Sequence, residues 1–447
     1  MSDNANLFDA GTVKGGGIGA PEQGGSQPER TGAPRVVTAD RGQLAWRTCD
    51  LESLLPAEHR ARLIWSAVEK LDLTKFYEPI AARENEPGRP AIDPKILVGL
   101  WLYATSEGVG SARELARLCG AHDAYRWICG GVSVNHHTLS DFRVGHAAAL
   151  DDLMTQVLAV LLHGGLVTLE RVAQDGMRVR ASAGASSFRR EPSLKACLEA
   201  ARSQVDEAKR QADEPDTQRS ARERAAVERA AREREERVTR ALAELPKARA
   251  AKNKAKDKEQ ARVSTTDPEA RVMKMGDGGF RPAYNAQFAT DTTSRVIVGV
   301  GVTNSGSDMG QADPMRAEIE RRTGGQPKDL LIDGGFAKLE SIEDASAAGT
   351  TVYAPVPKPR KEGIDPHEPK EGDTPAVAEW RQRMATAEAK EIYKQRAATA
   401  ETVNADLRTW RGLDRFLVRG SGKVLNVILW SAITYNVMRW IGAGLSG

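Results

Sequence analysis

The stretch of the chain that decides the fold is Asp329-Leu330-Leu331-Ile332-Asp333-Gly334-Gly335-Phe336. Its apolar residues predict a short buried strand that runs into Asp333 and two glycines. A helix is expected before it, around Pro314–Arg322, another after it, from Leu339, and then a further strand over Thr350–Ala354. This alternation predicts an α/β fold with a mixed sheet flanked by helices. It places Asp333 at the carboxyl end of a central strand, where open α/β sheets hold their sites.

Strand signals continue upstream of this core. Ala283–Thr290 and Arg295–Val302 flank the polar turn Asp291–Ser294, and this pattern predicts a β-hairpin. Val167–Ala181 sets Asp175-Gly176 among apolar residues, which is typical of a strand. The sequence therefore predicts a second acidic residue, Asp175, at the end of an apolar strand.

Size and composition limit the class of protein. The chain has 447 residues, of which 40% are hydrophobic, so two or three structural units are expected. No apolar run approaches the roughly 20 residues that span a bilayer, so no membrane segment is expected. Residues 1–50 are rich in small and polar residues and lack a secretory h-region, which favours a disordered leader and a cytoplasmic protein. A net charge of +3 does not by itself separate a nucleic-acid-binding protein from an ordinary enzyme.

The two regions outside the sheet have contrasting sequences. Residues 51–163 predict short helices, one of them capped by Asp93 before Pro94, and could be either a DNA-binding module or a helical scaffold. Residues 187–265 form an insertion rich in Arg, Glu, Ala and Lys, divided by Pro192, Pro215 and Pro246. Mixed charges of this kind favour solvated helix faces over DNA contact.

Three acidic residues stand apart from the surface charge. Asp175 and Asp333 are each followed by a glycine that allows close approach of a ligand, and Glu401 lies in a predicted helix. Taken singly, each Asp-Gly pair is more simply a turn, but three carboxylates from separate elements can hold Mg²⁺ or Mn²⁺ for phosphodiester transfer. Asp291, in the hairpin turn, and Asp308, in a loop, are weaker candidates.

The stretch from Tyr393 to Gly420 predicts a basic face beside Glu401. Read as one helix, it brings several side chains within an arc of about 80°. Guanidinium groups bind phosphate in a bidentate manner, so this face is expected to hold a DNA backbone, although a solvated basic face is the alternative. Gly412 is the position where this helix could be interrupted. The expected face comprises Tyr393, Glu401, Arg408, Arg411, Arg415 and Arg419.

Taken together, these motifs resemble the DDE transposases of bacterial insertion sequences, in the branch with an InsH-type N-terminal region. The resemblance covers nearly everything after the leader. Its landmarks run along the chain in order. They are Arg41-Gly42-Gln43, Leu54-Leu55-Pro56, Gly88-Arg89-Pro90, the segment from Ser111 through Asp141-Phe142-Arg143, Ala173-Gln174-Asp175-Gly176, Asp267-Pro268-Glu269-Ala270-Arg271, Tyr284-Asn285-Ala286-Gln287, Leu331-Ile332-Asp333-Gly334-Gly335-Phe336, and Tyr393, Arg396 and Glu401 followed seven positions later by Arg408. The chain departs from the family pattern where Arg408 stands in place of the common Lys and where Thr402-Val403-Asn404 replaces the usual Pro and Phe.

The resemblance implies a ribonuclease-H-like catalytic domain over residues 164–447, interrupted by the insertion and preceded by an all-α DNA-binding domain over 51–163. It implies a catalytic, metal-binding triad of Asp175, Asp333 and Glu401, with Tyr393, Arg396 and Arg408 holding DNA near the cut.

The expected function is metal-dependent cleavage at transposon ends and strand transfer into target DNA. The expected partners are double-stranded DNA, as terminal inverted repeats and target, and a second copy of the chain, at the nucleoid. A nuclease of similar fold and a non-catalytic, DNA-binding derivative of a transposase are the alternatives.

Overall fold

The structure, a computed structural model, describes residues 50–82, 90–213, 220–359 and 363–444. The leader expected over residues 1–50 lies, except for Asp50, outside the described residues. Everything described from residue 50 onward belongs to one unit. Within it, helices and a mixed sheet share a core, which confirms the expected mixed α/β class.

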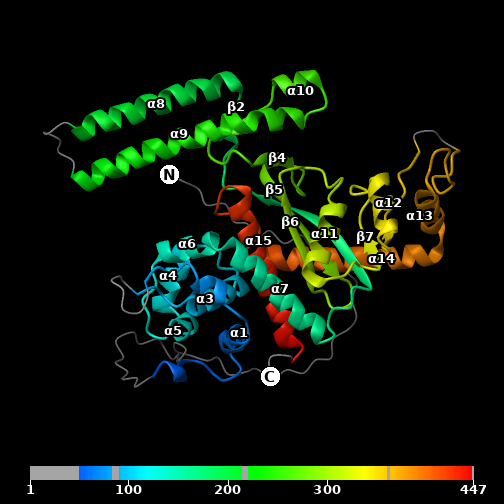
Figure 1. The fold of residues 1–447 in the computed structure, drawn as a ribbon, viewed down its shortest axis with the longest axis horizontal. Helices are drawn as coiled ribbons and strands as arrows, with labels where there is room; N and C mark the ends of the chain where they lie inside the picture. Colours follow the sequence, from blue (N-terminus) through cyan, green and yellow to red (C-terminus); the bar gives the residue numbers. More distant parts are fainter. Residues whose placement is uncertain (1–49, 83–89, 214–219, 360–362, 445–447) are drawn as a thin grey trace, which may run out of the picture. The chain divides into compact units, whose positions relative to one another are not determined.

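A group of short helices precedes the sheet (Figure 1). Asp93 caps α3 as predicted, because its side chain accepts a hydrogen bond from Lys95 N and Pro94 occupies the first turn. α3 is buried along nearly its whole length and forms the centre of this group. The elements are η1 (Glu52–Leu54), α1 (Arg60–Glu69), α2 (Thr74–Tyr77), α3 (Pro94–Ser106), α4 (Ala112–Ala121), α5 (Asp123–Cys129), α6 (His136–Gly145) and α7 (Ala147–His163).

The main sheet has six strands in the order β4-β5-β1-β7-β8, and β6 also pairs with β5. β1 runs antiparallel to β5 and parallel to β7, and β7 runs parallel to β8. The expected hairpin is present, because β5 and β6 pair antiparallel around the turn at Asp291. The strands are β1 (Arg171–Arg180), β4 (Arg271–Lys274), β5 (Phe280–Asp291), β6 (Ile297–Thr303), β7 (Asp329–Leu331) and β8 (Thr351–Tyr353).

The position of Asp175 differs from the prediction. It lies in the middle of β1, opposite Phe288 of β5, and does not end the strand. Asp333 follows β7 by two residues, at the carboxyl end, as predicted. The strand continues past Asp175 because Gly176 still pairs with Gln287, so the Asp-Gly dipeptide makes no turn here.

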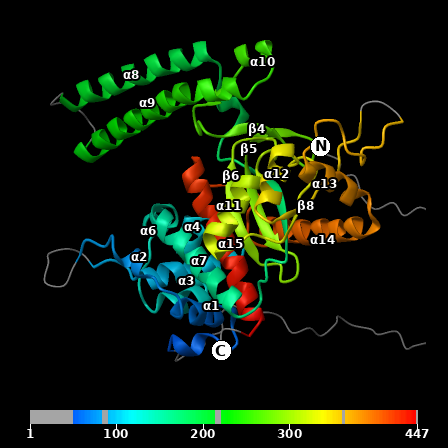
Figure 2. The ribbon, with the colours of Figure 1, turned by 45° about the vertical axis from the view of Figure 1, so that its right-hand side comes forward.

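The charged insertion is a pair of long helices, α8 (Glu191–Asp213) and α9 (Ala221–Ala250), followed by α10 (Ala255–Glu259). Both figures of the ribbon show α8 and α9 side by side, away from the main sheet (Figures 1 and 2). A two-stranded ladder of β2 (Phe188–Arg189) and β3 (Val263–Ser264), after the short η2 (Ala185–Ser187), closes the base. Pro246 does not divide the helices as predicted, since α9 continues through it and buries Leu245 beside it.

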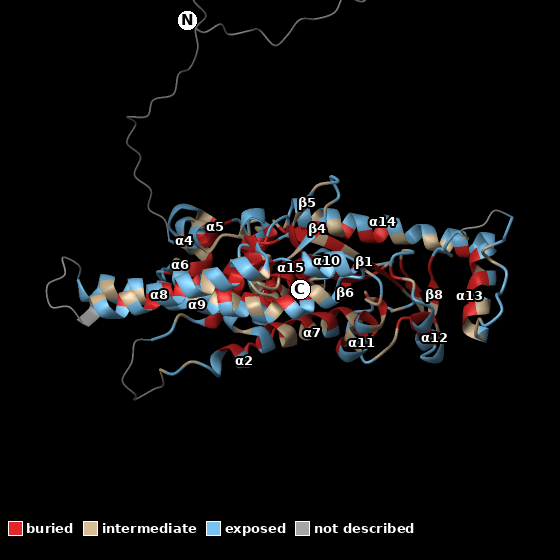
Figure 3. Cartoon of the chain, turned by 90° about the horizontal axis from the view of Figure 1, so that it is seen from above, coloured by how far each residue is buried: buried red, intermediate tan, exposed pale blue. Residues whose placement is uncertain are grey.

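The last helix, α15 (Ser421–Gly442), lies in the core (Figure 3). It packs against α7, α3 and β6, and its apolar residues around the whole circumference explain this burial. Asn436 is its buried polar contact to the sheet, because its amide group donates to Ile297 O at 2.8 Å and accepts from Ile297 N at 2.9 Å. The sequence alone also predicts that the apolar run Val424–Ile441 packs as a core helix, and the structure confirms this prediction.

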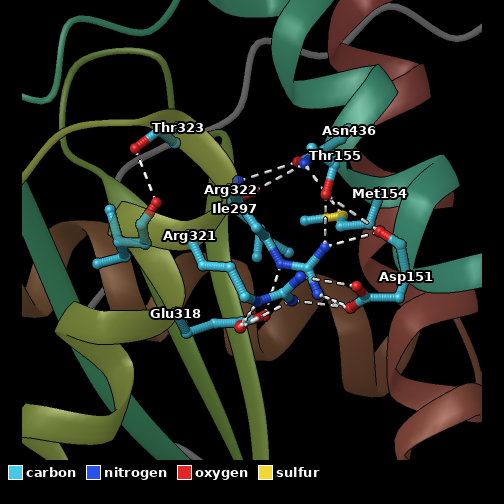
Figure 4. Close-up of polar contacts among 10 residues, drawn as sticks. Asp151, Met154, Thr155, Ile297, Glu318, Arg321, Arg322, Thr323 and Asn436 are labelled. Atoms are coloured by element: carbon cyan, nitrogen blue, oxygen red, sulfur yellow. Dashed lines mark hydrogen bonds and ion pairs between the residues drawn. The ribbon is translucent and has the colours of Figure 1, made fainter. Parts of the chain in front are cut away.

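Ion pairs join α7 to α11 (Ala312–Thr323), a helix that covers β6 (Figure 4). The Arg322 side chain is 1% exposed and donates to Asp151 Oδ1 at 2.5 Å and to Glu318 Oε1 at 2.5 Å. Arg321 donates to the other oxygen of Asp151 at 2.7 Å. The N-terminal helices are therefore held to the sheet by charge as well as by apolar packing.

The remaining helices are α12 (Leu339–Ala347), α13 (Pro375–Ala385) and α14 (Ala387–Thr409). The predicted continuous helix to Gly420 is wrong, because α14 ends at Thr409. Gly412 takes φ +67°, and a Cβ there would lie 2.7 Å from the carbonyl oxygen of Gly108, which itself has φ +73°. This close approach of two backbones turns the chain away from the helix axis.

Among the described residues, no single helix has the length and hydropathy to cross a bilayer. Helices α6 and α7 have the required length and hydropathy only when they are taken together, and the angle between them at their junction is 70°.

Candidate active site

The site is centred on Asp175, on the face of β1 that α14 covers. Arg396 Nη2 donates to Asp175 Oδ1 at 2.8 Å, and Asn404 Nδ2 donates to Asp175 Oδ2 at 2.9 Å. The N–H of Gly176 adds a third hydrogen bond of 3.0 Å to Oδ1. Helix α14 thus fixes the orientation of this carboxylate through two side chains about two turns apart.

Arg396 also brings Asp333 to the same place. Its Nη2 lies 3.6 Å from Asp333 Oδ2, so one guanidinium nitrogen lies between a carboxylate of β1 and one just after the neighbouring parallel strand β7. Asp333 Oδ1 is held by the N–H of Gly335 at 2.7 Å. The structure therefore brings together two of the three predicted acids around one positive group.

Burial sets the electrostatics of this pair. Loss of water raises the pKa of Asp175 above its ordinary value, although the charge of Arg396 acts in the opposite direction. Tyr393 lies beside these groups, and burial likewise raises the pKa of its hydroxyl. The site thus holds negative charge that a single guanidinium only partly compensates.

Glu401 is exposed and lines the same cavity as Asp175, which has a volume of about 610 Å³. Arg408 lines it as well, two turns further along α14. Asp333 is not among the lining residues and is connected to Asp175 through Arg396. Arg178, Arg180 and Arg281 add further positive charge to the cavity.

Divalent cations such as Mg²⁺ bind to oxygen ligands, which the acidic residues of this site carry. Within the described residues, no three His, Cys, Asp or Glu side chains lie close enough to hold an ion together. Asp175 and Asp333 nevertheless supply the hard oxygen ligands that Mg²⁺ and Mn²⁺ prefer, and they share one cationic group, Arg396. The two carboxylates therefore offer ligands of the type that suits such a cation, at a position where the guanidinium of Arg396 lies between them.

The three arginines that follow α14 do not share the face of Glu401. Arg411 pairs with Asp406 at 2.9 Å and donates to Ser106 O at 3.0 Å, so it ties α14 to the N-terminal helices. Arg415 is exposed, and Arg419 Nε donates to Ser182 O at 3.3 Å. The expected alignment fails because the chain leaves the helix before them.

Sequence reasoning missed Asn404, whose only signal was its place three residues after Glu401, one turn along the helix. It also undervalued Asp308, which accepts hydrogen bonds from Asn285 at 2.6 Å and from Gln287 at 2.8 Å. A Cβ on Gly176 would lie 2.3 Å from Asp308 Oδ1, so the glycine makes room for this polar cluster behind Asp175. Asp291 is a turn residue, as expected.

Two family models match the chain. A transposase domain (DUF772) matches residues 49–145, and a transposase DDE domain matches residues 247–437. The chain belongs to the DDE transposases of insertion sequences. The DDE match of this transposase includes Asp333 and Glu401, whereas Asp175 lies outside both matched ranges and is placed by geometry alone. No curated protein and no solved structure gives a significant match to the chain.

Proposed function

We propose that this transposase cuts DNA at the ends of its element and joins the ends to target DNA, with Asp175, Asp333 and Glu401 as catalytic, metal-binding residues. The observation that carries the proposal is the shared position of Arg396 between the two aspartates, beside a cavity that Glu401 lines. Separate elements supply the three acids, whose carboxylates are the type of ligand that holds divalent cations for phosphodiester transfer.

Asp175 and Asp333 would hold Mg²⁺ or Mn²⁺, and Glu401 would complete the set of ligands. When bound, such ions activate the attacking oxygen and stabilise the leaving oxygen. Asp175 is held ready for this role by Asn404 and by the N–H of Gly176. We infer that Arg396 exchanges its aspartate partners for a DNA phosphate, since a guanidinium pairs with either anion.

The basic residues around the cavity would hold the DNA backbone. Arg408 lies on α14 two turns after Glu401 and lines the same cavity, and Tyr393 lies near Arg396. Arg415 and Arg419 would contact DNA from the segment after α14. Arg411 would have to leave Asp406 and Ser106 to do so, which makes it the weakest of the proposed contacts.

We further propose that residues 164–447 form a ribonuclease-H-like domain with the insertion 187–265. The antiparallel order β6-β5-β1 followed by the parallel strands β7 and β8 supports this assignment. We also propose that the helices of residues 51–163 recognise the terminal inverted repeats. Two chains would bring two DNA ends together, and this would take place in the cytoplasm, at the nucleoid.

Replacement of Asp333 tests the proposal. Asp333→Ala is expected to abolish Mg²⁺-dependent cleavage of a duplex that carries an end of the element, while the melting temperature and DNA binding remain. Asp344→Ala, an exposed aspartate of α12, is the matched control and should cleave as the wild type does. Cleavage by Asp333→Ala would remove this residue from the triad.

The same assay separates the alternatives. Joined products identify a transposase, and cleavage without joining identifies a nuclease. A wild-type chain that binds DNA but does not cleave it with Mg²⁺ or Mn²⁺ would be a non-catalytic derivative.

A further inference from the structure

A second cavity, of about 420 Å³, lies between the N-terminal helices and the segment after α14. One wall is the start of α4, capped by Ser111, and the opposite wall is the loop that Gly412 turns. The residues that line it include Gly110, Ser111, Arg143, Asp414 and Arg415.

Arg143 is the unusual residue of this cavity. It is 9% exposed, and its guanidinium stacks on the ring of Trp101, 4.6 Å from the centroid. Nη1 donates to Gly110 O at 2.5 Å, whereas the buried Nε has no hydrogen-bond partner within the described residues. Burial lowers the pKa of Arg143 to about 10, so the group is still charged at neutral pH.

The other buried arginines of the described chain are neutralised. Arg322 pairs with Asp151 and Glu318, Arg381 pairs with Asp373, and Arg316 pairs with Asp313. For Arg143, no carboxylate partner occurs within the described residues. A buried charge without a counter-charge is strongly destabilising, as it is when one partner of a buried ion pair is removed. This cost favours an anion that arrives from outside.

The acidic residues that line the cavity do not meet this need. Glu114 pairs with Arg117 on the exposed side of α4 at 2.5 Å. Asp414 is exposed and also lines the active-site cavity. The two cavities therefore meet at Asp414, and Arg415 is the next residue along the chain.

We propose that this second cavity binds a phosphate group of the DNA backbone, with Arg143 as its buried anchor and Arg415 as its exposed contact. The proposal rests on the proposed function and adds a fixed contact beyond the cut site. Because the contact is to phosphate, it is expected to hold DNA of any sequence. One DNA strand would then contact both the N-terminal helices, at Arg143, and the proposed catalytic residues.

The test is the salt dependence of binding to a short duplex of random sequence, measured by fluorescence anisotropy without divalent ions. Arg143→Met keeps an unbranched, flexible side chain beside Trp101 but removes the charge. Binding is expected to weaken about tenfold, and the slope of log K against log[salt] to become shallower by about 0.9, the value for one phosphate contact. Arg415→Gln, an exposed change that leaves the core intact, should lower the slope in the same way. Lys328→Gln, which removes an exposed charge paired with Glu170 outside both cavities, should leave it unchanged.

Each outcome decides the proposal. Wild-type affinity and slope in a folded Arg143→Met would overturn it, and if that variant does not fold, an unchanged slope in Arg415→Gln would overturn it. A third outcome is that inorganic phosphate stabilises the wild type but not Arg143→Met, while both proteins bind DNA equally well. The cavity would then be a site for free anions, and the proposal that it binds the DNA backbone would be wrong. A wild type that binds no DNA would refute the proposed function itself, whereas unchanged binding in the variants would refute only this inference.

Discussion

Asn404 donates a hydrogen bond of 2.9 Å to Asp175, across 229 positions of the chain. The donor lies on α14 one turn after Glu401, and the acceptor lies in the middle of β1. The amide therefore couples the position of the helix to the orientation of the central carboxylate. We therefore expect a substitution of Asn404 to alter the orientation of the Asp175 carboxylate.

Asn404→Ala should lower both stability and cleavage. Removal of the amide leaves a largely buried carboxylate oxygen without its donor, at a cost of about 1 to 3 kcal/mol in the free energy of unfolding. Urea denaturation and a cleavage assay measure the two effects. Thr402→Ala, an exposed neighbour on the same helix, is the control. Full cleavage by Asn404→Ala would show that the orientation of Asp175 does not depend on this contact.

Arg396→Ala should bind Mn²⁺ more tightly than the wild type does. The guanidinium lies between Asp175 and Asp333, so a divalent cation has to displace it, and its removal leaves both carboxylates to the ion. The rise in melting temperature with added Mn²⁺ measures this affinity. The same variant should cleave poorly, because it lacks the proposed phosphate contact. If Mn²⁺ raised the melting temperature of Arg396→Ala less than that of the wild type, the guanidinium would not occupy the position of the cation.

Asp151→Asn should make stability less dependent on pH. Burial raises the pKa of Asp151, but hydrogen bonds and charge from Arg321 and Arg322 outweigh it, so the pKa lies below its ordinary value of 3.8. A depressed carboxyl pKa stabilises the fold above 3.8, and this contribution disappears as the pH falls through the folded-state pKa. Because the Asp151 side chain is 38% exposed, screening limits the expected loss at neutral pH to about 1 kcal/mol.

The matched control for this prediction is Asp152→Asn, since Asp152 pairs with the exposed Lys75. Melting temperatures of the three proteins between neutral and acidic pH give the comparison. The gap between wild type and Asp151→Asn should close on acidification, and a gap that stays constant would show that the ion pairs with Arg321 and Arg322 do not cause it.

Gly412→Ala should destabilise the protein by at least about 2 kcal/mol, because the residue has φ +67° and the new Cβ would meet the Gly108 carbonyl oxygen at 2.7 Å. Gly422→Ala, in the exposed first turn of α15 with open space around its Cα, should instead raise stability by about 0.5 to 1 kcal/mol. Equal effects of the two substitutions in thermal unfolding would refute the close contact between the backbones.

The sequence predicted elements that local pattern controls. The apolar run before Asp333, the cap at Asp93 and the core helix near the end all follow from residues within one turn or one strand. The end of α14 could not be predicted, since Gly412 adopts its conformation against Gly108, a residue 304 positions away. For the same reason the contacts of Asn404 with Asp175 and of Arg143 with Trp101 could not be predicted, because each joins segments that are far apart in the sequence.

The central position of α15 has a consequence for synthesis of the protein on the ribosome. α15 contacts the N-terminal helices on one side and β6 on the other, and Asn436 satisfies both backbone groups of Ile297. Until residues 421–442 have emerged, the earlier segments have no partner for a large apolar surface. Premature termination before Ser421 should therefore leave a nascent polypeptide that chaperones and proteases recognise, so that truncated copies of the gene yield little persistent protein.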